Sequence, residues 1–227
     1  MGYTVRKRIK RSIFRYLLTK MYRDLLEEEF GRRTIYSVKN YIGPFDEVAQ
    51  YDHLAVVSPS SESGIVRGEL VHALQKIAKP QHTLLLAGER NVAKPIYSQI
   101  AGIAPEQIVT AGLHDDMDYS WNYEQPPPKM PAFDIVISQA MLEHLVDPYR
   151  HVCDCYSLLK PGGTMILHTV MPGFKYHRFP VDCFRFYPDW FEEVAKRLGG
   201  TVSYRYLGRQ THIAYCICKA THQTVLV

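Results

Sequence analysis

The stretch FDIVISQAMLEHLVDP, residues 133–148, decides the fold of this chain. Its first part, residues 133–138, is a short apolar run with several β-branched side chains, which predicts a strand buried in a parallel sheet. One turn of helix is expected next, over residues 140–145. A change from a buried strand to a helical segment within so few residues is typical of α/β folds.

A second helix and a second strand complete the unit. Asp147 is a good helix N-cap and Pro148 suits the first helical position, so a helix is predicted over residues 148–159. The sequence KPGG at residues 160–163 ends that helix, and residues 164–170 are predicted to form the next strand. The crossover of such a unit is right-handed, and ligands bind beyond the carboxyl ends of its strands. We therefore expect the functional site at those ends.

These segments resemble a known family. FDIVISQAMLEHLVDP and the following LLKPGGTMILHTV, residues 158–170, are similar to the fourth and fifth motifs of the class I S-adenosylmethionine (SAM)-dependent methyltransferases. The form FD-x-V-x-S-x-x-x-LEH with LKPGG is that of the type 11-like subgroup, and the alternative is another doubly wound domain with a similar loop. The resemblance covers roughly residues 83–219. It implies a Rossmann-like, mostly parallel sheet with a C-terminal antiparallel hairpin and helices on both faces.

Length and composition agree with one such domain. The chain has 227 residues, which we divide into a basic helical extension or lid over residues 1–48 and a methyltransferase domain over residues 49–227. No apolar run approaches the roughly 20 residues of a membrane span, and no signal peptide is predicted. The five cysteines are an odd number, which favours free thiols in a reducing, cytoplasmic compartment.

The N-terminal segment carries an unusual charge. Residues 1–23 contain eight basic residues and no acidic one, beside apolar residues at helical spacing, so a helix is predicted over residues 5–29. This helix could pack on the domain or a partner, or lie at an anionic membrane surface. The rest of the chain carries a small net negative charge, which argues against nucleic acid as a partner.

The first cofactor motif departs from the family pattern. A strand is predicted over residues 83–87, and the resemblance implies an acidic residue and then G-x-G at its end. The sequence here is LLLAGERN: Gly88 matches the first glycine, Arg90 replaces the second, and Leu86 occupies the usual acidic position. Glu89 is the substitute carboxylate that the sequence offers.

Further cofactor contacts are implied after the next strands. Past the strand predicted over residues 108–111, the ribose hydroxyls need an acidic residue, which Asp115 or Asp116 could supply. Trp121 either stacks on the adenine or packs in the core, and Asn122 could bond to the adenine edge. The full set of residues expected to bind SAM, or its product S-adenosylhomocysteine, is Gly88, Glu89, Asp115, Asp116, Trp121, Asn122, Ser138, Gln139 and Met141.

The segment over residues 171–188 is long, irregular, and rich in aromatic and charged residues, which is typical of a functional loop. It contains the pattern YH-x-x-P-x-D-x-x-R-F at residues 176–186, which resembles methyltransferases linked to polysaccharide or glycan assembly. A helix over residues 189–198 and strands over residues 201–207 and 212–219 are predicted to follow.

The chemistry expected is O-methylation of a sugar hydroxyl. Such a hydroxyl is a weak nucleophile and gains from a general base, for which histidine is suited. His177 with Asp182 is the first choice, and His144 is the other catalytic candidate. Tyr176, Arg185 and His168 are expected to bind the substrate. A divalent metal on Asp182 and His177 lacks a convincing third carboxylate, so no metal is predicted. The alternatives are another small-molecule acceptor, or a non-catalytic SAM-fold module that binds a partner or a membrane.

Overall fold

The structure, a computed structural model, describes residues 54–57, 68–174, 176–178, 180–208 and 212–221. The predicted N-terminal helix and the basic extension lie outside these residues. None of the described helices is long and apolar enough to cross a membrane.

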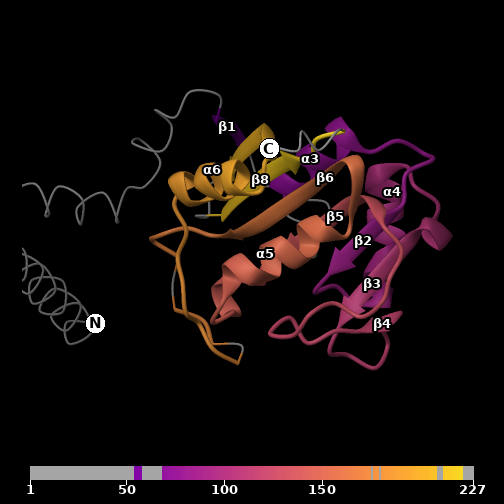
Figure 1. Ribbon diagram of the computed structural model, residues 1–227, viewed down its shortest axis with the longest axis horizontal. Coiled ribbons are helices and arrows are strands. Elements are labelled where there is room, and N and C mark those ends of the chain that lie inside the picture. Colours follow the sequence, from indigo (N-terminus) through magenta and orange to yellow (C-terminus); the bar gives the residue numbers. More distant parts are fainter. Residues whose placement is uncertain (1–53, 58–67, 175, 179, 209–211, 222–227) are drawn as a thin grey trace, which may run out of the picture. The chain divides into compact units, whose positions relative to one another are not determined.

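One eight-stranded sheet forms the centre of the described chain, in the order β1-β7-β8-β6-β5-β2-β3-β4 (Figure 1). β8 runs antiparallel to both of its neighbours, β6 and β7, and every other pair is parallel. The predicted mostly parallel sheet with a C-terminal antiparallel hairpin is therefore confirmed. The strands are β1 (Leu54–Val57), β2 (Leu84–Ala87), β3 (Ile108–Gly112), β4 (Tyr119–Ser120), β5 (Phe133–Gln139), β6 (Leu159–Val170), β7 (Thr201–Gly208) and β8 (His212–Cys218).

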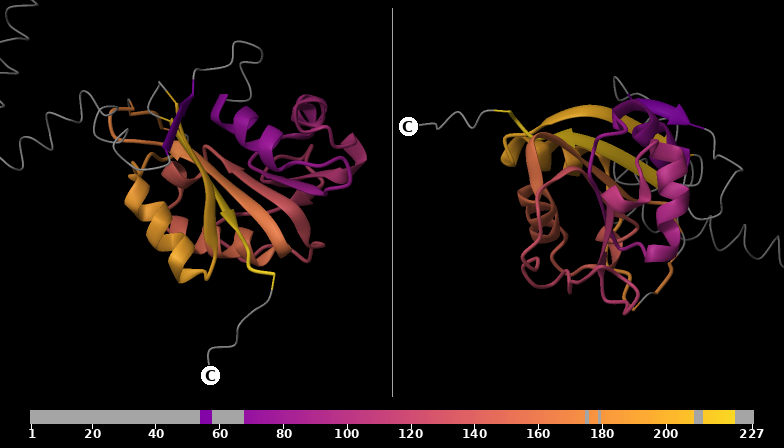
Figure 2. Two further views of the ribbon diagram at one scale, coloured as in Figure 1. Left: turned by 90° about the horizontal axis from the view of Figure 1, so that it is seen from above. Right: turned by 90° about the vertical axis from the view of Figure 1, so that its right-hand side faces the viewer.

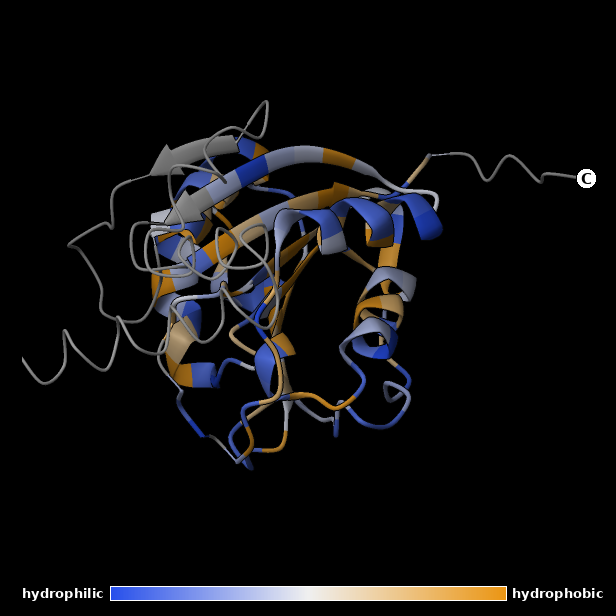
Figure 3. Cartoon of the chain, turned by 90° about the vertical axis from the view of Figure 1, so that its left-hand side faces the viewer, coloured by the Kyte–Doolittle hydropathy of each residue, from blue (hydrophilic) through white to orange (hydrophobic). Residues whose placement is uncertain are grey.

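Helices cover both faces of this sheet (Figure 2). Alternate residues of each strand point to opposite faces, so Leu84 and Leu86 pack with α3 and α4, while Leu85 and Ala87 pack with α5 and α6. In Figure 3 the central strands are coloured mainly as hydrophobic, and the helices carry both hydrophobic and hydrophilic segments. The helices are α3 (Gly68–Ile77), α4 (Lys94–Ala101), α5 (Pro148–Ser157) and α6 (Pro188–Arg197), with short 3-10 turns η1 (Asn91–Ala93), η2 (Pro105–Gln107) and η3 (Leu142–His144).

The predicted unit around residues 133–170 forms with one difference. Asp147 caps α5 by accepting a hydrogen bond from the Arg150 backbone N–H at 3.1 Å, as expected for an N-cap. β6 begins at Leu159 and not at residue 164, because Leu159 already pairs with Phe133 before the KPGG segment bulges out of register. A side chain at Gly163 would lie 3.0 Å from the Asp134 carbonyl oxygen, so this bulge depends on glycine.

Three elements were not predicted. β1 extends the sheet by pairing in parallel with β7, α4 follows β2, and β4 adds a two-residue edge to β3. The segment between β6 and α6 contains no helix or strand in its described part, as predicted. All five cysteines are free.

Candidate active site

A cavity of about 550 Å³ lies beyond the carboxyl ends of β2, β3 and β5. Residues just after each of these strands line it, and Pro180 and Val181 of the long loop close one side. This is the position that the strand–helix–strand argument predicts for a ligand. Six of the residues expected in the site line this cavity: Gly88, Glu89, Asn122, Gln139, Met141 and His144.

The backbone at the cavity is unusual in two places. Gly88 has φ +100°, and a Cβ at this position would lie 2.8 Å from Met141 Cγ and 2.9 Å from its sulfur. A glycine is therefore required by both conformation and space. Ala140, at the end of β5, is the one non-glycine residue with positive φ in the described chain, at +49°. Strained backbone of this kind concentrates at ligand sites.

Glu89 is held at the cavity by a chain of hydrogen bonds. Gln139 Nε2 donates to Glu89 Oε1 at 2.6 Å, and the Tyr97 hydroxyl donates to Gln139 Oε1 at 2.8 Å. Tyr97 is fully buried in α4, so the chain is anchored in the core. Burial raises the pKa of the Glu89 carboxyl to about 7. The cavity thus contains a carboxyl group that changes charge near neutral pH.

Four residues expected to bind the cofactor lie elsewhere. Asp115 is exposed and does not line the cavity, and Asp116 accepts a hydrogen bond from Arg90 Nε at 2.9 Å outside it. Trp121 is buried in the core, where its indole N–H donates to the Gln125 carbonyl at 3.0 Å, so of the two roles considered for it the structure gives it core packing. The Ser138 hydroxyl is also buried; its partner is a histidine of α5.

The partner of Ser138 is His151, with 2.9 Å between the hydroxyl and Nε2. Burial lowers the pKa of His151 to about 3, so this ring is neutral at physiological pH. Trp121 and Tyr123 pack against the same ring. This cluster joins β5 to α5, and of its members Tyr123 lines the cavity whereas Ser138 and His151 do not.

A second polar group, which we call the histidine cluster, consists of Glu143, His144 and His177. The Glu143 side chain is fully buried; its Oε2 accepts the Thr169 hydroxyl at 2.5 Å, and its backbone carbonyl accepts the Cys183 N–H at 2.7 Å. The long loop is thereby fixed against the turn that follows β5. Glu143 belongs to the LEH motif that the sequence singled out, but the motif was interpreted through His144 alone.

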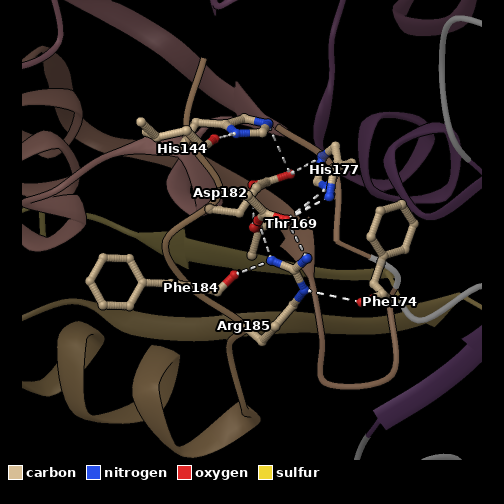
Figure 4. Close-up of polar contacts among 9 residues, drawn as sticks. His144, Thr169, Phe174, His177, Asp182, Phe184 and Arg185 are labelled. Atoms are coloured by element: carbon tan, nitrogen blue, oxygen red, sulfur yellow. Dashed lines mark hydrogen bonds and ion pairs between the residues drawn. The ribbon is translucent and has the colours of Figure 1, made fainter. Parts of the chain in front are cut away.

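The two histidines of the cluster face each other and share the carboxylate (Figure 4). Their ring centroids are 4.8 Å apart. His144 Nδ1 lies 2.5 Å from the Val181 carbonyl oxygen, and His144 Nε2 lies 4.0 Å from Glu143 Oε1. His177 Nε2 lies 3.9 Å from the same oxygen. Of the two, His144 lines the cavity and His177 does not.

Asp182 and Arg185 brace the loop. Asp182 accepts the His177 backbone N–H at 2.7 Å and forms a two-pronged ion pair with Arg185 (Figure 4). The Arg185 guanidinium holds the pKa of the Asp182 carboxyl far below its usual range. Arg185 also donates to the carbonyls of Phe174 and Phe184. These contacts give Arg185 a positioning role in the loop and leave it away from the cavity lining.

The two remaining substrate candidates also lie away from the cavity. Tyr176 is 72% exposed and does not line it. His168 is buried near the carboxyl end of β6, on the face of the sheet that packs with α3, where its Nε2 is 3.9 Å from Glu69 Oε2 and its ring stacks on His212. No sequence pattern indicated Tyr97 or the buried contact to Glu69, because both depend on α3 and α4 packing against the sheet.

Residues 104–167 match the methyltransferase domain family. The Ubiquinone biosynthesis O-methyltransferase of Xanthomonas campestris pv. campestris (strain B100) is 40% identical over 75 residues, 30% of this chain and 31% of that protein. The tRNA U34 carboxymethyltransferase of Hahella chejuensis is 41% identical over 51 residues, 22% of this chain and 16% of that protein. The chain thus spans less than a third of the length of either relative. Neither is named for a sugar acceptor, so the glycan-associated resemblance stays a prediction.

Solved structures share the fold at low sequence identity. The CcbJ methyltransferase from Streptomyces caelestis has a TM-score of 0.52 at 11% identity, over 67% of this chain and 88% of that one. The [4+2]-cyclase SpnF has a TM-score of 0.53 at 12% identity, over 82% of this chain and 96% of that one. Together with the matched segment, these similarities agree with the predicted resemblance. The chain has the class I SAM-dependent methyltransferase fold, and its centre matches the methyltransferase domain family.

Proposed function

We propose that this protein is a SAM-dependent methyltransferase that transfers a methyl group to a hydroxyl oxygen. The observation that carries the proposal is the cavity at the ends of β2, β3 and β5, in a chain whose residues 104–167 match the methyltransferase domain family. A volume of about 550 Å³ is within the range of sites that enclose ligands of this size.

The cavity residues fit the cofactor in part. Gly88 provides the backbone turn, and Glu89, Asn122 and Gln139 offer polar groups to a ligand that carries a sulfonium and an ammonium charge. An ionised Glu89 would favour those positive charges, and its pKa of about 7 leaves it ready to ionise. The ribose position differs from the family pattern, because Asp115 and Asp116 lie outside the cavity and His114 lines it after β3. When bound, SAM supplies the activated methyl group.

The chain's own contribution is to orient the acceptor and to manage its proton. Of the histidines predicted to act as the base, His144 lines the cavity, and Glu143 and His177 adjoin it. A proton acceptor placed there would favour attack by a hydroxyl by roughly a hundredfold or more. Alignment of the acceptor with the methyl group would contribute several kcal/mol in addition.

Two acceptor classes have support. The pattern at residues 176–186 supports a sugar or glycan hydroxyl. An aromatic hydroxyl is supported by the relatives named for ubiquinone biosynthesis and by apolar side chains at the cavity wall, including Met117, Met141 and Leu145. The competing function is a non-catalytic binding module, supported by Arg90 in place of the second motif glycine and by the occurrence of this fold in a cyclase.

We also propose that the protein is cytoplasmic and that its basic segment, residues 1–23, contacts an anionic membrane surface. Vesicles that contain anionic lipid should then bind the full chain and release it as salt is raised. Deletion of residues 1–23 should abolish this binding without changing cofactor affinity. Vesicle binding that survives the deletion would place the contact elsewhere.

The central test is calorimetry with S-adenosylhomocysteine, followed by methyl transfer from SAM to a panel of nucleotide sugars, glycans, aromatic diols and amines. We expect binding in the micromolar range, about −7 to −8 kcal/mol, and transfer to one of the two hydroxyl classes. Binding without transfer to any acceptor would favour the binding module. A preference for amines would overturn the O-methyltransferase proposal, and an absence of binding at millimolar ligand would overturn the enzyme proposal.

A further inference from the structure

We infer that the histidine cluster, Glu143, His144 and His177, is a binding site for one divalent transition-metal ion of the Zn²⁺ class. The three side chains can each offer one ligand atom, and these atoms lie within 4.8 Å of one another. The ligands come from two segments: the turn after β5 and the loop between β6 and α6. An ion bound there would fasten the loop to the end of the sheet.

The protons in the cluster argue for a cation at its centre. A carbonyl oxygen can only accept, so the contact of His144 Nδ1 with Val181 requires the proton of a neutral ring to be on Nδ1. The Nε2 of that ring then presents a lone pair toward Glu143 Oε1, 4.0 Å away. His177 Nε2 also lies near this oxygen, 3.9 Å from Glu143 Oε1, while its Nδ1 is 3.5 Å from Asp182 Oδ2 without forming a hydrogen bond.

Two acceptor atoms, His144 Nε2 and Glu143 Oε1, therefore face each other, and His177 Nε2 lies beside them. Glu143 Oε1 is buried and makes no hydrogen bond within the part of the chain that the structure describes. A buried carboxylate oxygen in this state is costly, and a bound cation would remove that cost. This orphaned oxygen, in a side chain with no exposed surface, is the independent sign that the cluster is built to hold an ion.

The surroundings have the pattern of a second coordination shell. Metal-bound histidines donate their other ring N–H to a carbonyl or a carboxylate, and bound carboxylates are themselves hydrogen-bonded. The Val181 carbonyl fills the first role for His144, and the Thr169 hydroxyl fills the second for Glu143. Asp182 Oδ2 lies 3.5 Å from His177 Nδ1. Asp182 is in turn fixed by Arg185. Asp182 and Arg185 do not line the cavity, and their role in this proposal is to support the metal ligands.

The donor set selects the class of ion. Two imidazole nitrogens and one carboxylate oxygen suit zinc or iron(II) with open positions for an exogenous ligand, whereas magnesium prefers oxygen ligands alone. With bonds of about 2.0–2.1 Å, the ligand atoms of a tetrahedral site are about 3.3 Å apart. The present separations of 3.9 and 4.0 Å would therefore close by several tenths of an ångström around the ion.

The role of the ion rests on the proposed function. His144 lines the cavity, so an open coordination position can reach an acceptor oxygen placed there. The ion would bind that oxygen and lower its pKa, so that its proton is lost to solvent; with the ion bound, the imidazoles would act as ligands in place of the proton acceptor described for the metal-free site.

The test is a calorimetric titration of the full, metal-free chain with ZnCl₂, in the absence of SAM and acceptor. We expect one strong equivalent per chain, weakened at least a hundredfold in His177→Ala and in Glu143→Gln. Glu143→Gln keeps the size of the buried side chain, and His177→Ala changes a partly exposed one, so at least one variant should fold. His72→Ala, which removes an exposed histidine on α3, should bind as the parent does. The visible absorption of added Co²⁺ should appear in the parent and in His72→Ala and vanish in both cluster variants.

Failure here is distinguishable from failure of the proposed function. S-adenosylhomocysteine should bind the EDTA-treated chain with unchanged affinity, because His144 is the one metal ligand that lines the cavity and the polar groups assigned to the cofactor, Glu89, Asn122 and Gln139, are not metal ligands. No Zn²⁺ binding at about 1 mM, or equal binding by parent and both cluster variants, would overturn the metal site while leaving the cofactor proposal intact. Imidazolium resonances for His144 and His177 at pH 7.5 would also overturn it, because a proton would then occupy the centre of the cluster.

Discussion

Two carboxylates at the carboxyl edge of the sheet, Glu89 after β2 and Glu143 after β5, show how neighbouring loops can form two kinds of site. Each has one oxygen held by a single side chain: Gln139 donates to Glu89, and the Thr169 hydroxyl donates to Glu143. At Glu89, burial alone raises the pKa of the carboxyl to about 7. At Glu143 two imidazoles face the second oxygen. The Glu89 carboxyl can gain or lose a proton near neutral pH. The Glu143 carboxylate instead has two imidazoles beside it that could bind the same cation.

The supports of the two sites differ as well. Glu89 is linked through Gln139 to Tyr97, which is buried between α4 and the sheet. The histidine cluster depends on the irregular loop, and that loop depends on Asp182 and Arg185. A substitution of Asp182 or Arg185 should therefore disturb the histidine cluster strongly. Ligand binding in the cavity should be sensitive to smaller changes, in the backbone at Gly88 and in the charge of Glu89.

The largest effect is expected for Asp182→Asn. This side chain has no exposed surface and holds both Arg185 and the His177 backbone, so its loss deprives the partly buried Arg185 guanidinium of its carboxylate. We expect the free energy of unfolding at pH 7 to fall by roughly 2–4 kcal/mol, measured by urea titration. Because the pKa of Asp182 is lower in the folded chain than in the unfolded one, its stabilisation is present above about pH 4 and is lost as the pH falls further. The difference between parent and variant should shrink in acid.

Glu193→Gln is the matched control for Asp182→Asn. Glu193 pairs with Arg197 on the surface of α6, with both side chains more than half exposed. Its removal should change stability by less than about 0.5 kcal/mol. If the two variants lose equal stability, the Asp182–Arg185 pair contributes no more than a surface ion pair. The proposed dependence of the histidine cluster on this pair would then be contradicted.

The second effect is at the cavity end, for Gly88→Ala. The new methyl group would meet Met141 at 2.8 Å, and φ +100° is unfavourable for alanine. We expect S-adenosylhomocysteine affinity to fall tenfold to a hundredfold, about 1.4–2.7 kcal/mol, measured by calorimetry. Zn²⁺ binding should not change, which would separate the two sites. Gly102→Ala is the control: it also has positive φ, +66°, but nothing lies within 4 Å of the added methyl, and its effect should be limited to stability.

A smaller effect concerns the charge of Glu89. Because burial raises its pKa in the folded chain, folding favours the protonated form, and the parent should lose stability as the pH rises from about 4.5 to about 7. Glu89→Gln keeps the contact with Gln139 but cannot ionise. Allowing for partial exposure, the variant should be more stable than the parent by roughly 1–2 kcal/mol at pH 8 and nearly equal to it at pH 5. Thermal unfolding across that range measures the difference, and parallel curves would contradict it.

The sequence predicted the sheet well because strand positions depend on local patterns. β5 was expected over residues 133–138 and spans Phe133–Gln139, and β8 was expected over residues 212–219 and spans His212–Cys218. β1 was not predicted, because its four residues lie in a stretch of mixed character and its pairing partner is β7, far along the chain. The pattern marks where a strand ends but not which distant strand it joins.

The candidate site was less predictable for the same reason. Glycine and strand-end positions such as Gly88 and Gln139 are set by the fold and line the cavity. The partners of Trp121 and Arg185, and the convergence of Glu143 with His177, are set by tertiary packing. From the sequence, Trp121 could either stack on the adenine or pack in the core, and Arg185 was expected to contact the substrate.

The smallest effect is expected for Asp116→Asn, and it tests the ribose prediction directly. Asp116 accepts from Arg90 Nε at 2.9–3.0 Å, both side chains are well exposed, at 38% and 54%, and neither lines the cavity. An exposed pair of this kind contributes less than about 1 kcal/mol to stability. A carboxylate engaged with Arg90 outside the cavity is also not available to the ribose. S-adenosylhomocysteine affinity should therefore change less than twofold, measured by the same calorimetry as for Gly88→Ala. A tenfold loss would mean that Asp116 turns into the cavity when the cofactor binds, and that the cavity end, like the histidine cluster, takes its final form only with its ligand present.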